Sequence, residues 1–178
     1  MDAKLLDTIK KLLQAIADLF KTMPPPNAQP VIFYSDKLYD AAYASIGKDV
    51  SPDDLAEDRF GCFESVSKII QRVFPQLNFP TILSTKVGFD HFEKSPSWKP
   101  INYPEKGCVI LNVTGTGNGK VANGHVGIVG KNLSEDGTLW IMSNNSETGT
   151  WEVSYSIESW QRYFDWKGGM PTHFYRRV

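Results

Sequence analysis

The side chains that could do chemistry in this chain lie in three short segments. Gly61-Cys62 opens a stretch with helical periodicity, Gly124-His125-Val126-Gly127 follows later in the chain, and Ser143-Asn144-Asn145 lies beyond it. A cysteine becomes a good nucleophile when it is deprotonated, and a helix N-terminus and a neighbouring imidazole both lower the pKa of its thiol. These residue types therefore predict a thiol nucleophile, its base and an amide that orients the base.

The chemistry that such a set performs is attack on an amide carbonyl. Cys62 would attack as a thiolate, and His125 would hold the proton and return it to the leaving amine. Either Asn144 or Asn145 would accept a hydrogen bond from the imidazole, and strand alternation lets only one of them face His125. We choose Asn144 and keep Asn145 as the alternative. Backbone amides at the helix start, including that of Cys62, would form the oxyanion hole.

A cysteine on an apolar helix face is often only a small buried hydrophobic residue. Cys62 fits that description too, because spacings of four, seven and eleven residues place it on one helix face with other apolar side chains. These side chains are Val66, Ile69 and Val73. The rest of the sequence has to decide between a structural and a catalytic role for Cys62.

The setting of His125 favours catalysis. Gly124 and Gly127 flank it and are expected to leave space beside its ring. His91, expected in a loop, and His173, expected to pack in a late strand, have no comparable setting. The reaction needs no cofactor, and the sequence shows no ligand cluster for a metal, so we expect neither.

The composition limits the class of protein. The chain has 178 residues, of which 41% are hydrophobic and 22% charged, as expected for one globular domain. Its formal net charge of −1 gives no basic field for nucleic acid, so we expect no nucleic-acid partner. Two cysteines without a CxxC pair argue against a disulfide scaffold and a structural zinc site. No apolar run approaches the roughly 18 residues that span a membrane, and the N-terminus does not resemble a secretory signal.

The chain divides into three parts by pattern. Residues 1–23 are expected to form an amphipathic helix whose apolar positions follow a heptad seam from residue 3 to residue 23. Residues 24–37 are a proline-rich linker, and residues 38–178 form the main domain. The helix could dock on its own domain, form a homo-oligomer or bind a partner protein, and its mixed charges weaken a fourth possibility, membrane-surface binding.

Helical patterns precede strand patterns in the main domain, which predicts an α+β fold with N-terminal helices packed on one face of an antiparallel sheet of about four to six strands. A helix is expected from Cys62 to about Phe74. Ser156 is expected to begin a short helix that reaches Asp165. The expected strands cover residues 109–113, 125–129, 138–142 and 151–155.

Two aromatic residues are candidates for contact with a substrate. Trp98 and Tyr103 lie in a stretch punctuated by prolines before the first expected strand, where we expect a loop. Their rings could stack on a sugar or a peptide, whereas the other aromatic residues are expected in the core. The glycine-rich segment 115–124 lacks the spacing of a phosphate-binding loop and is expected to be a flexible loop that could line a groove.

These segments resemble the CHAP and NlpC-type papain-like cysteine peptidases and amidases that cut bacterial peptidoglycan, especially phage-encoded ones. The resemblance covers roughly residues 38–178 and is most specific at Gly124-His125-Val126-Gly127-Ile128-Val129. Gly61-Cys62-Phe63-Glu64-Ser65-Val66 is similar to the start of the family's nucleophile helix, and residues 104–110 to the start of its first core strand. Residues 143–146 are similar to the segment with the third catalytic residue.

The resemblance implies a peptidoglycan hydrolase, either an endolysin or a virion-associated lysin. Such an enzyme cuts a stem-peptide crosslink or the amide that joins peptide to glycan. It is made in the bacterial host cytoplasm and acts on the cell wall after release or from a virion. The chain departs from the family pattern at Gly107-Cys108, where Gly-Asp is usual, and at the third residue, which is often Glu or His. Two alternatives stay open: a catalytically silent phage structural protein, and a thiol hydrolase that acts on protein.

Overall fold

The computed structural model describes residues 11, 14, 34–51, 61–130 and 138–178. The chain separates into Met1–Ile32 and Phe33–Val178, and the description that follows concerns the second unit. The helix expected at residues 1–23 lies outside the described residues except for Lys11 and Gln14, and so does the linker as far as residue 33. No helix in the described part is long and apolar enough to cross a membrane.

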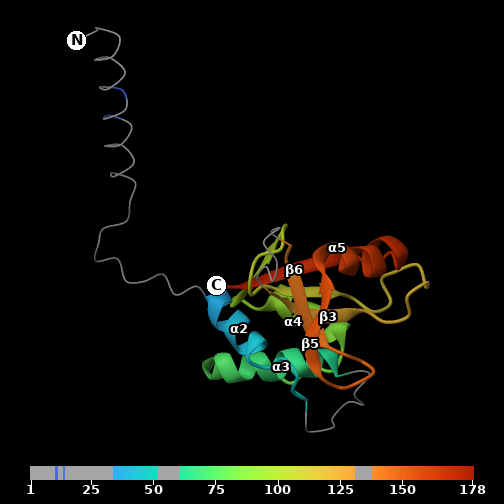
Figure 1. The fold of residues 1–178 in the computed structure, drawn as a ribbon, viewed down its shortest axis with the longest axis horizontal. Helices are drawn as coiled ribbons and strands as arrows, with labels where there is room; N and C mark the ends of the chain where they lie inside the picture. The colour runs from blue at the N-terminus through green and yellow to red at the C-terminus, as the bar shows by residue number, and fades with distance from the viewer. Residues whose placement is uncertain (1–10, 12–13, 15–33, 52–60, 131–137) are drawn as a thin grey trace. The chain divides into compact units, whose positions relative to one another are not determined.

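Helices and strands alternate irregularly along the described chain (Figure 1). The helical elements are α2 (Tyr34–Tyr43), α3 (Cys62–Val73), the 3₁₀ turn η2 (Pro75–Leu77), α4 (Thr85–Lys94), α5 (Ile157–Trp160) and the π-helical η3 (Gln161–Lys167). The strands are β1 (Trp98–Ile101), β2 (Val109–Asn112), β3 (His125–Val129), β4 (Trp140–Asn144), β5 (Trp151–Ser156) and β6 (Thr172–Arg177).

The six strands form one antiparallel sheet in the order β1-β6-β2-β3-β4-β5. The last strand, β6, inserts between β1 and β2, and it pairs Phe174 with Ile101 on one side and with Ile110 on the other. The predicted α+β class is confirmed. The helix from Cys62 and the strands β2 to β5 also lie close to the expected ranges, because their apolar patterns are strong.

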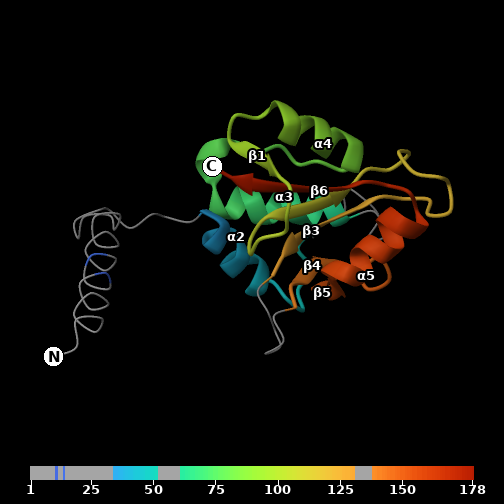
Figure 2. The same cartoon turned by 90° about the horizontal axis from the view of Figure 1, so that it is seen from above.

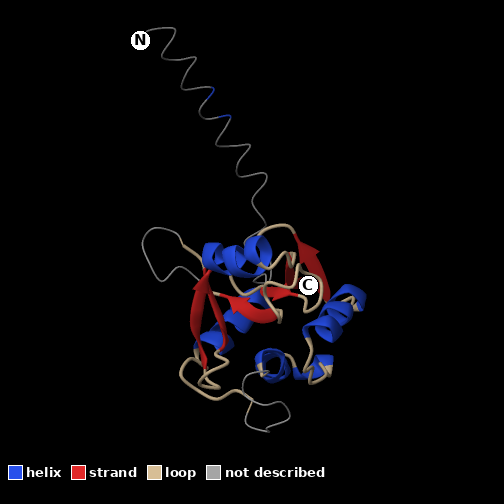
Figure 3. Cartoon of the chain, turned by 90° about the vertical axis from the view of Figure 1, so that its right-hand side faces the viewer, coloured by secondary structure: helices blue, strands red, loops and turns tan. Residues whose placement is uncertain are grey.

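The N-terminal helices α2, α3 and α4 pack on one face of the sheet, as expected, and α5 and η3 cover the other face, where the sequence predicted no helical layer (Figures 1 and 2). One face carries the α3-side core, in which side chains of α2, α3 and α4 pack on Val109, Leu111, Val126 and Ile128. The other face carries the α5-side core, in which Trp160 and Phe164 pack on Cys108, Ile110, Val129 and Ile141. Figure 3 shows the strands between these helical layers. Because alternate residues of β2 and β3 point to opposite cores, both strands are buried on both faces.

Three local expectations were wrong. α2 begins at Tyr34, inside the range assigned to the linker. His91 lies in α4, not in a loop, and its ring packs edge-on against Phe79. Trp98 begins strand β1, which tolerates Pro100 because it is an edge strand of the sheet.

Candidate active site

Cys62 is the first residue of α3 and follows Gly61, which serves as the N-cap residue of the helix. Its thiol is free and half-buried, and it contacts the α3-side core. Burial raises the pKa of the Cys62 thiol to about 11, although hydrogen bonds from the backbone of Phe63, Val126 and Cys62 itself lower it. The thiol is therefore protonated at neutral pH, with three backbone donors already placed around the sulfur.

His125 is the first residue of β3, as expected, and lies opposite Asn112 of β2. Its imidazole stacks on the indole of Trp160 with ring centroids 5.2 Å apart, and on the ring of Phe164 at 5.7 Å. Burial lowers the pKa of His125 to about 4. The imidazole is therefore neutral at neutral pH and packs with the α5-side core.

The structure thus places the Cys62 thiol of α3 next to the strand β3 that carries His125, but on the opposite face from the His125 imidazole. The thiol accepts a hydrogen bond from the N–H of Val126, the residue that follows His125. The side chain of Val126 belongs to the α3-side core, whereas the ring of His125 contacts residues of the α5-side core. Among the described residues no hydrogen bond joins the thiol to the imidazole, so this conformation contains no ion pair that would activate Cys62.

The two candidate asparagines have different environments. Asn144 is buried at the end of β4, on the face of that strand which carries Met142 into the α3-side core. Asn145 follows the strand and holds the turn to β5. Its side-chain oxygen accepts hydrogen bonds from the N–H groups of Glu147 at 2.7 Å and Thr148 at 3.3 Å, and its amide donates to Glu152 at 2.7 Å. These three hydrogen bonds hold the side chain of Asn145 in the turn. Asn144, by contrast, lies on the same α3 side of the sheet as Cys62.

The glycines around His125 serve the sheet and do not open space beside the ring. A Cβ atom on Gly127 would lie 2.7 Å from the carbonyl oxygen of Met142 in the neighbouring strand. A Cβ atom on Gly124 would lie 2.0 Å from the carbonyl oxygen of Asn112. Close approach of backbones explains both residues, so the interpretation that they give His125 room is wrong.

The two residues predicted to contact a substrate differ in their exposure to solvent. Trp98 is 4% exposed and packs against Phe92 with ring centroids 4.9 Å apart, so its ring is not available for stacking on a ligand. Tyr103 is 61% exposed and remains available.

Sequence reasoning missed the polar residue that supports His125. Asn112 is fully buried, and its amide donates to the carbonyl of Met170 at 2.7 Å and to the hydroxyl of Thr172 at 3.0 Å. Its carbonyl oxygen accepts a hydrogen bond from the indole N–H of Trp160, the ring on which His125 stacks. The sequence signal that could have identified Asn112 is its position as a polar residue at the end of an apolar strand run.

The glycine-rich segment before β3 is anchored in this structure. The backbone N–H of Asn118 donates to Gly168 at 2.8 Å, and its side-chain amide donates to the carbonyl of Lys167 at 3.0 Å. These bonds hold the segment against the end of η3. They argue against the flexible loop that the sequence suggested.

The candidate residues form no metal-binding cluster in the described part of the chain, and they do not line either of its two best-formed cavities. The described part of the chain holds no cluster of three or more histidine, cysteine or acidic side chains that could bind a metal ion. Two cavities, of about 310 and 370 Å³, are lined by other residues than Cys62, His125 and Asn144. Comparison with protein-family models gives no match, and comparison with curated proteins gives none either.

Proposed function

We propose that this chain is a thiol hydrolase with a papain-like catalytic domain that cleaves an amide bond of bacterial peptidoglycan. The observation that carries the proposal is the position of the Cys62 sulfur. It lies at the N-terminus of the 12-residue helix α3, next to the N–H groups of Cys62, Phe63 and Val126. A helix N-terminus and oriented amides stabilise a thiolate and the oxyanion that forms when it attacks a carbonyl.

In the proposed reaction Cys62 gives its proton to His125 and attacks the carbonyl carbon of the scissile amide. The amine leaves with that proton, and water then releases the acyl group from the sulfur. The imidazole has to approach the sulfur for this step, because a thiol with a pKa of about 11 is almost entirely protonated at neutral pH. We therefore assign the described arrangement to a resting form of the enzyme.

Asn144 is the proposed orienting residue because it is buried on the α3 side, where an imidazole would meet the thiol. Asn145 is the weaker choice, since its side chain already makes three hydrogen bonds within the turn. The proposed enzyme is made in the host cytoplasm and reaches the cell wall after release or from a virion, as the motif resemblance implies.

A second candidate function is a catalytically silent binding or structural protein of a phage. The separation of the thiol from the imidazole, and the neutral state of both groups at pH 7, favour this candidate. In that protein Cys62 would be a core residue and His125 a member of an aromatic stack.

Digestion of isolated bacterial sacculi separates the two functions. The wild-type chain, Cys62→Ala and Cys108→Ala are incubated with sacculi, and the soluble products are identified by mass spectrometry. Cys108 is the matched control because it is also free but is completely buried in the α5-side core. Release of peptide or muropeptide by the wild type and Cys108→Ala but not by Cys62→Ala supports the hydrolase, and the product masses identify the bond. Equal release by all three, or release by none, overturns it.

A further inference from the structure

A cavity lies on the η3 side of the sheet, between the end of β1, the start of β6 and η3; it is called the β6 cavity below. Its volume of about 310 Å³ is within the range of small-molecule sites, about 300–1,000 Å³. In the strand order β6 is two strands from β3, and none of the candidate catalytic residues lines the cavity. A ligand bound here would therefore not occupy the candidate active site. The lining residues that matter are Ile101, Gln161, Asp165, Thr172, His173 and Phe174.

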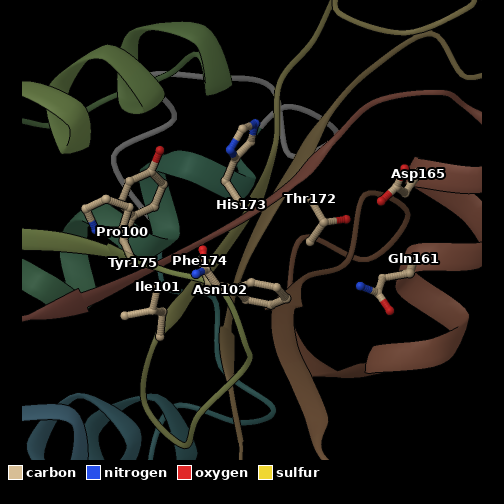
Figure 4. A pocket seen from close by; sticks show the side chains of 9 residues that line it. All are labelled: Pro100, Ile101, Asn102, Gln161, Asp165, Thr172, His173, Phe174 and Tyr175. Atoms are coloured by element: carbon tan, nitrogen blue, oxygen red, sulfur yellow. The ribbon is translucent and has the colours of Figure 1, made fainter.

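Side chains from η3 and β6 converge on the β6 cavity. Figure 4 shows Gln161 and Asp165 reaching from η3 toward β6, and the ring of Phe174 pointing back toward them. His173 projects from the other side of β6, where its ring packs on Phe89 with ring centroids 4.8 Å apart. The cavity thus brings a carboxylate, a side-chain amide and an aromatic ring together.

The charge of the β6 cavity is negative. Among the described residues that line it, Asp165 is the acidic one, and none is a lysine or an arginine. Burial lowers the pKa of His173 more than the carboxylates of Glu93 and Asp165 raise it, so this imidazole is neutral at neutral pH. In the described part of the chain no hydrogen bond or ion pair engages the carboxylate of Asp165. The cavity therefore presents a negative charge that no neighbouring cation neutralises.

The cavity along α4 has a different charge balance. Its volume is about 370 Å³, and its lining includes both Asp90 and Lys94. An acid and a base in one cavity offset each other, so the sign of a ligand's charge is not selected there. Of the two cavities, the β6 cavity is thus the one whose lining favours a cation and disfavours phosphate and other anions.

The rest of the lining favours an organic cation over a metal ion. A single carboxylate falls short of the about six to eight oxygen ligands that Ca²⁺ takes. Ile101 and Phe174 add an apolar wall that suits an alkyl stem, and aromatic rings attract cations through their faces. The side-chain oxygens of Gln161 and Thr172 can accept hydrogen bonds from a guanidinium or an ammonium group.

From these features we infer that the β6 cavity binds an aliphatic cation, a guanidinium or ammonium group on an alkyl stem. The head group pairs with the carboxylate of Asp165 and donates to Gln161, and the stem lies against Phe174. A free amine and an arginine or lysine side chain carry this same chemistry. Binding requires no reaction at Cys62, because neither Cys62 nor His125 lines the cavity.

Titration with a cationic ligand and its neutral analogue tests the inference. The full chain is labelled with ¹⁵N, and amide shifts are followed with Nα-acetylarginine amide and with Nα-acetylcitrulline amide, in which a neutral urea replaces the guanidinium. We expect the arginine compound to shift the amides of Asp165 and Thr172. The citrulline compound should bind at least about tenfold more weakly, a difference of ~1.4 kcal/mol. No shift, shifts that map elsewhere, or equal binding of both compounds overturns the inference.

Two further probes identify the head group and its source. Nα-acetyllysine amide carries an ammonium in place of the guanidinium, and butylguanidine carries the guanidinium without peptide groups. Tighter binding of butylguanidine than of Nα-acetylarginine amide would support a free amine or guanidine as the ligand. The reverse order would support a side chain of a peptide.

Variants that change one charge locate the site. Asp165→Asn should weaken binding of Nα-acetylarginine amide at least about tenfold and remove its advantage over the citrulline compound. Gln161→Glu adds a second carboxylate and should strengthen binding at least about threefold, a gain that a misfolded variant could not show. Asp90→Asn is the matched control, because it neutralises an aspartate in the other cavity and should leave binding unchanged.

Unchanged affinity in Asp165→Asn and Gln161→Glu, or an equal loss in Asp90→Asn, would contradict the site. Sacculus digestion without binding of the arginine compound would refute the cation site alone. Binding of that compound without digestion would refute the hydrolase alone.

Discussion

The Cys62 thiol and the His125 imidazole reach the same end of β3 from two different layers of the molecule. The thiol accepts a hydrogen bond from the N–H of Val126 and packs on the α3 side. The imidazole belongs to His125, the residue before Val126, and it stacks on Trp160 on the α5 side. Adjacent residues of a strand point to opposite faces, so the backbone of β3 lies between the candidate nucleophile and its candidate base.

Replacing His125 by phenylalanine separates the chemistry of this residue from its packing. His125→Phe keeps a ring against Trp160, so we expect a folded protein. If His125 is the base, release from sacculi should fall by at least about 10²-fold, the usual size of a general-base contribution. His91→Phe is the control, because His91 also packs on an aromatic ring, that of Phe79. Full release by folded His125→Phe would exclude His125 as the base.

The same residue makes stability depend on pH. Burial lowers the pKa of His125 from 6.5 to about 4, so the unfolded chain binds more protons than the folded chain between these values. The stabilising contribution is complete above pH 6.5 and is lost as the pH falls toward 4. Between pH 7 and pH 5 the free energy of unfolding should decrease by about 2 kcal/mol on account of His125.

Urea unfolding of the wild type and His125→Phe at both pH values measures this contribution. Burial also lowers the pKa values of His91 and His173, so the wild type loses further stability from them in the same direction. The difference between the two proteins isolates His125. An equal loss in both proteins would contradict the lowered pKa.

The reactivity of Cys62 should report its protonated state. With a thiol pKa of about 11, alkylation by iodoacetamide in the free protein should be slow at pH 7 and rise about tenfold per pH unit up to pH 10. Cys108 is completely buried and its thiol pKa is raised to about 12, so it should label far more slowly. Mass spectrometry of the two cysteine peptides measures both rates. A plateau of the Cys62 rate below pH 8 would show that a base already activates the thiol.

Most of the central sheet could be predicted from sequence, because its apolar runs are long and bounded by turn residues. α3 was predictable for a similar reason, since its apolar residues recur at helical spacing and Pro75 follows it. α4 and β1 were not predictable from such patterns. α4 contains Gly88, which packs against the ring of Phe63, and β1 contains Pro100. Tertiary packing overrides weak local propensity in both elements.

The candidate site was predictable in part. Strand alternation already requires that His125 and Val126 point to opposite faces. Strand alternation does not determine which face of the sheet α3 covers, because β3 is apolar on both faces and either face could pack against α3. The structure shows that α3 covers the face of Val126 and that α5 covers the other. Whether the thiol can contact the imidazole depends on which face α3 covers, and long-range packing determines that face.

The two asparagines after β4 should respond differently to truncation. Asn145→Ala removes two hydrogen bonds to the turn backbone and one to Glu152, so the free energy of unfolding should fall by about 1–3 kcal/mol. Its release from sacculi should persist at temperatures where the variant is folded. Asn144→Ala should instead reduce release by more than about tenfold in folded protein if Asn144 orients the base. The opposite pattern, with release lost only in Asn145→Ala, would transfer the orienting role to Asn145.

The hydrogen bonds of Asn112 should be among the costliest to remove in the described part of the chain. Asn112→Ala leaves the indole N–H of Trp160 and the carbonyl of Met170 without their partner inside the α5-side core. A buried polar group without a partner costs about 1–3 kcal/mol, so the loss in unfolding free energy should be about 2–5 kcal/mol. Asn118→Ala is the matched control, because the side chain of Asn118 donates to Lys167 in an exposed position and its loss should cost under about 1.5 kcal/mol. Urea unfolding measures both values, and equal losses would show that Asn112 does not hold Trp160 beneath His125.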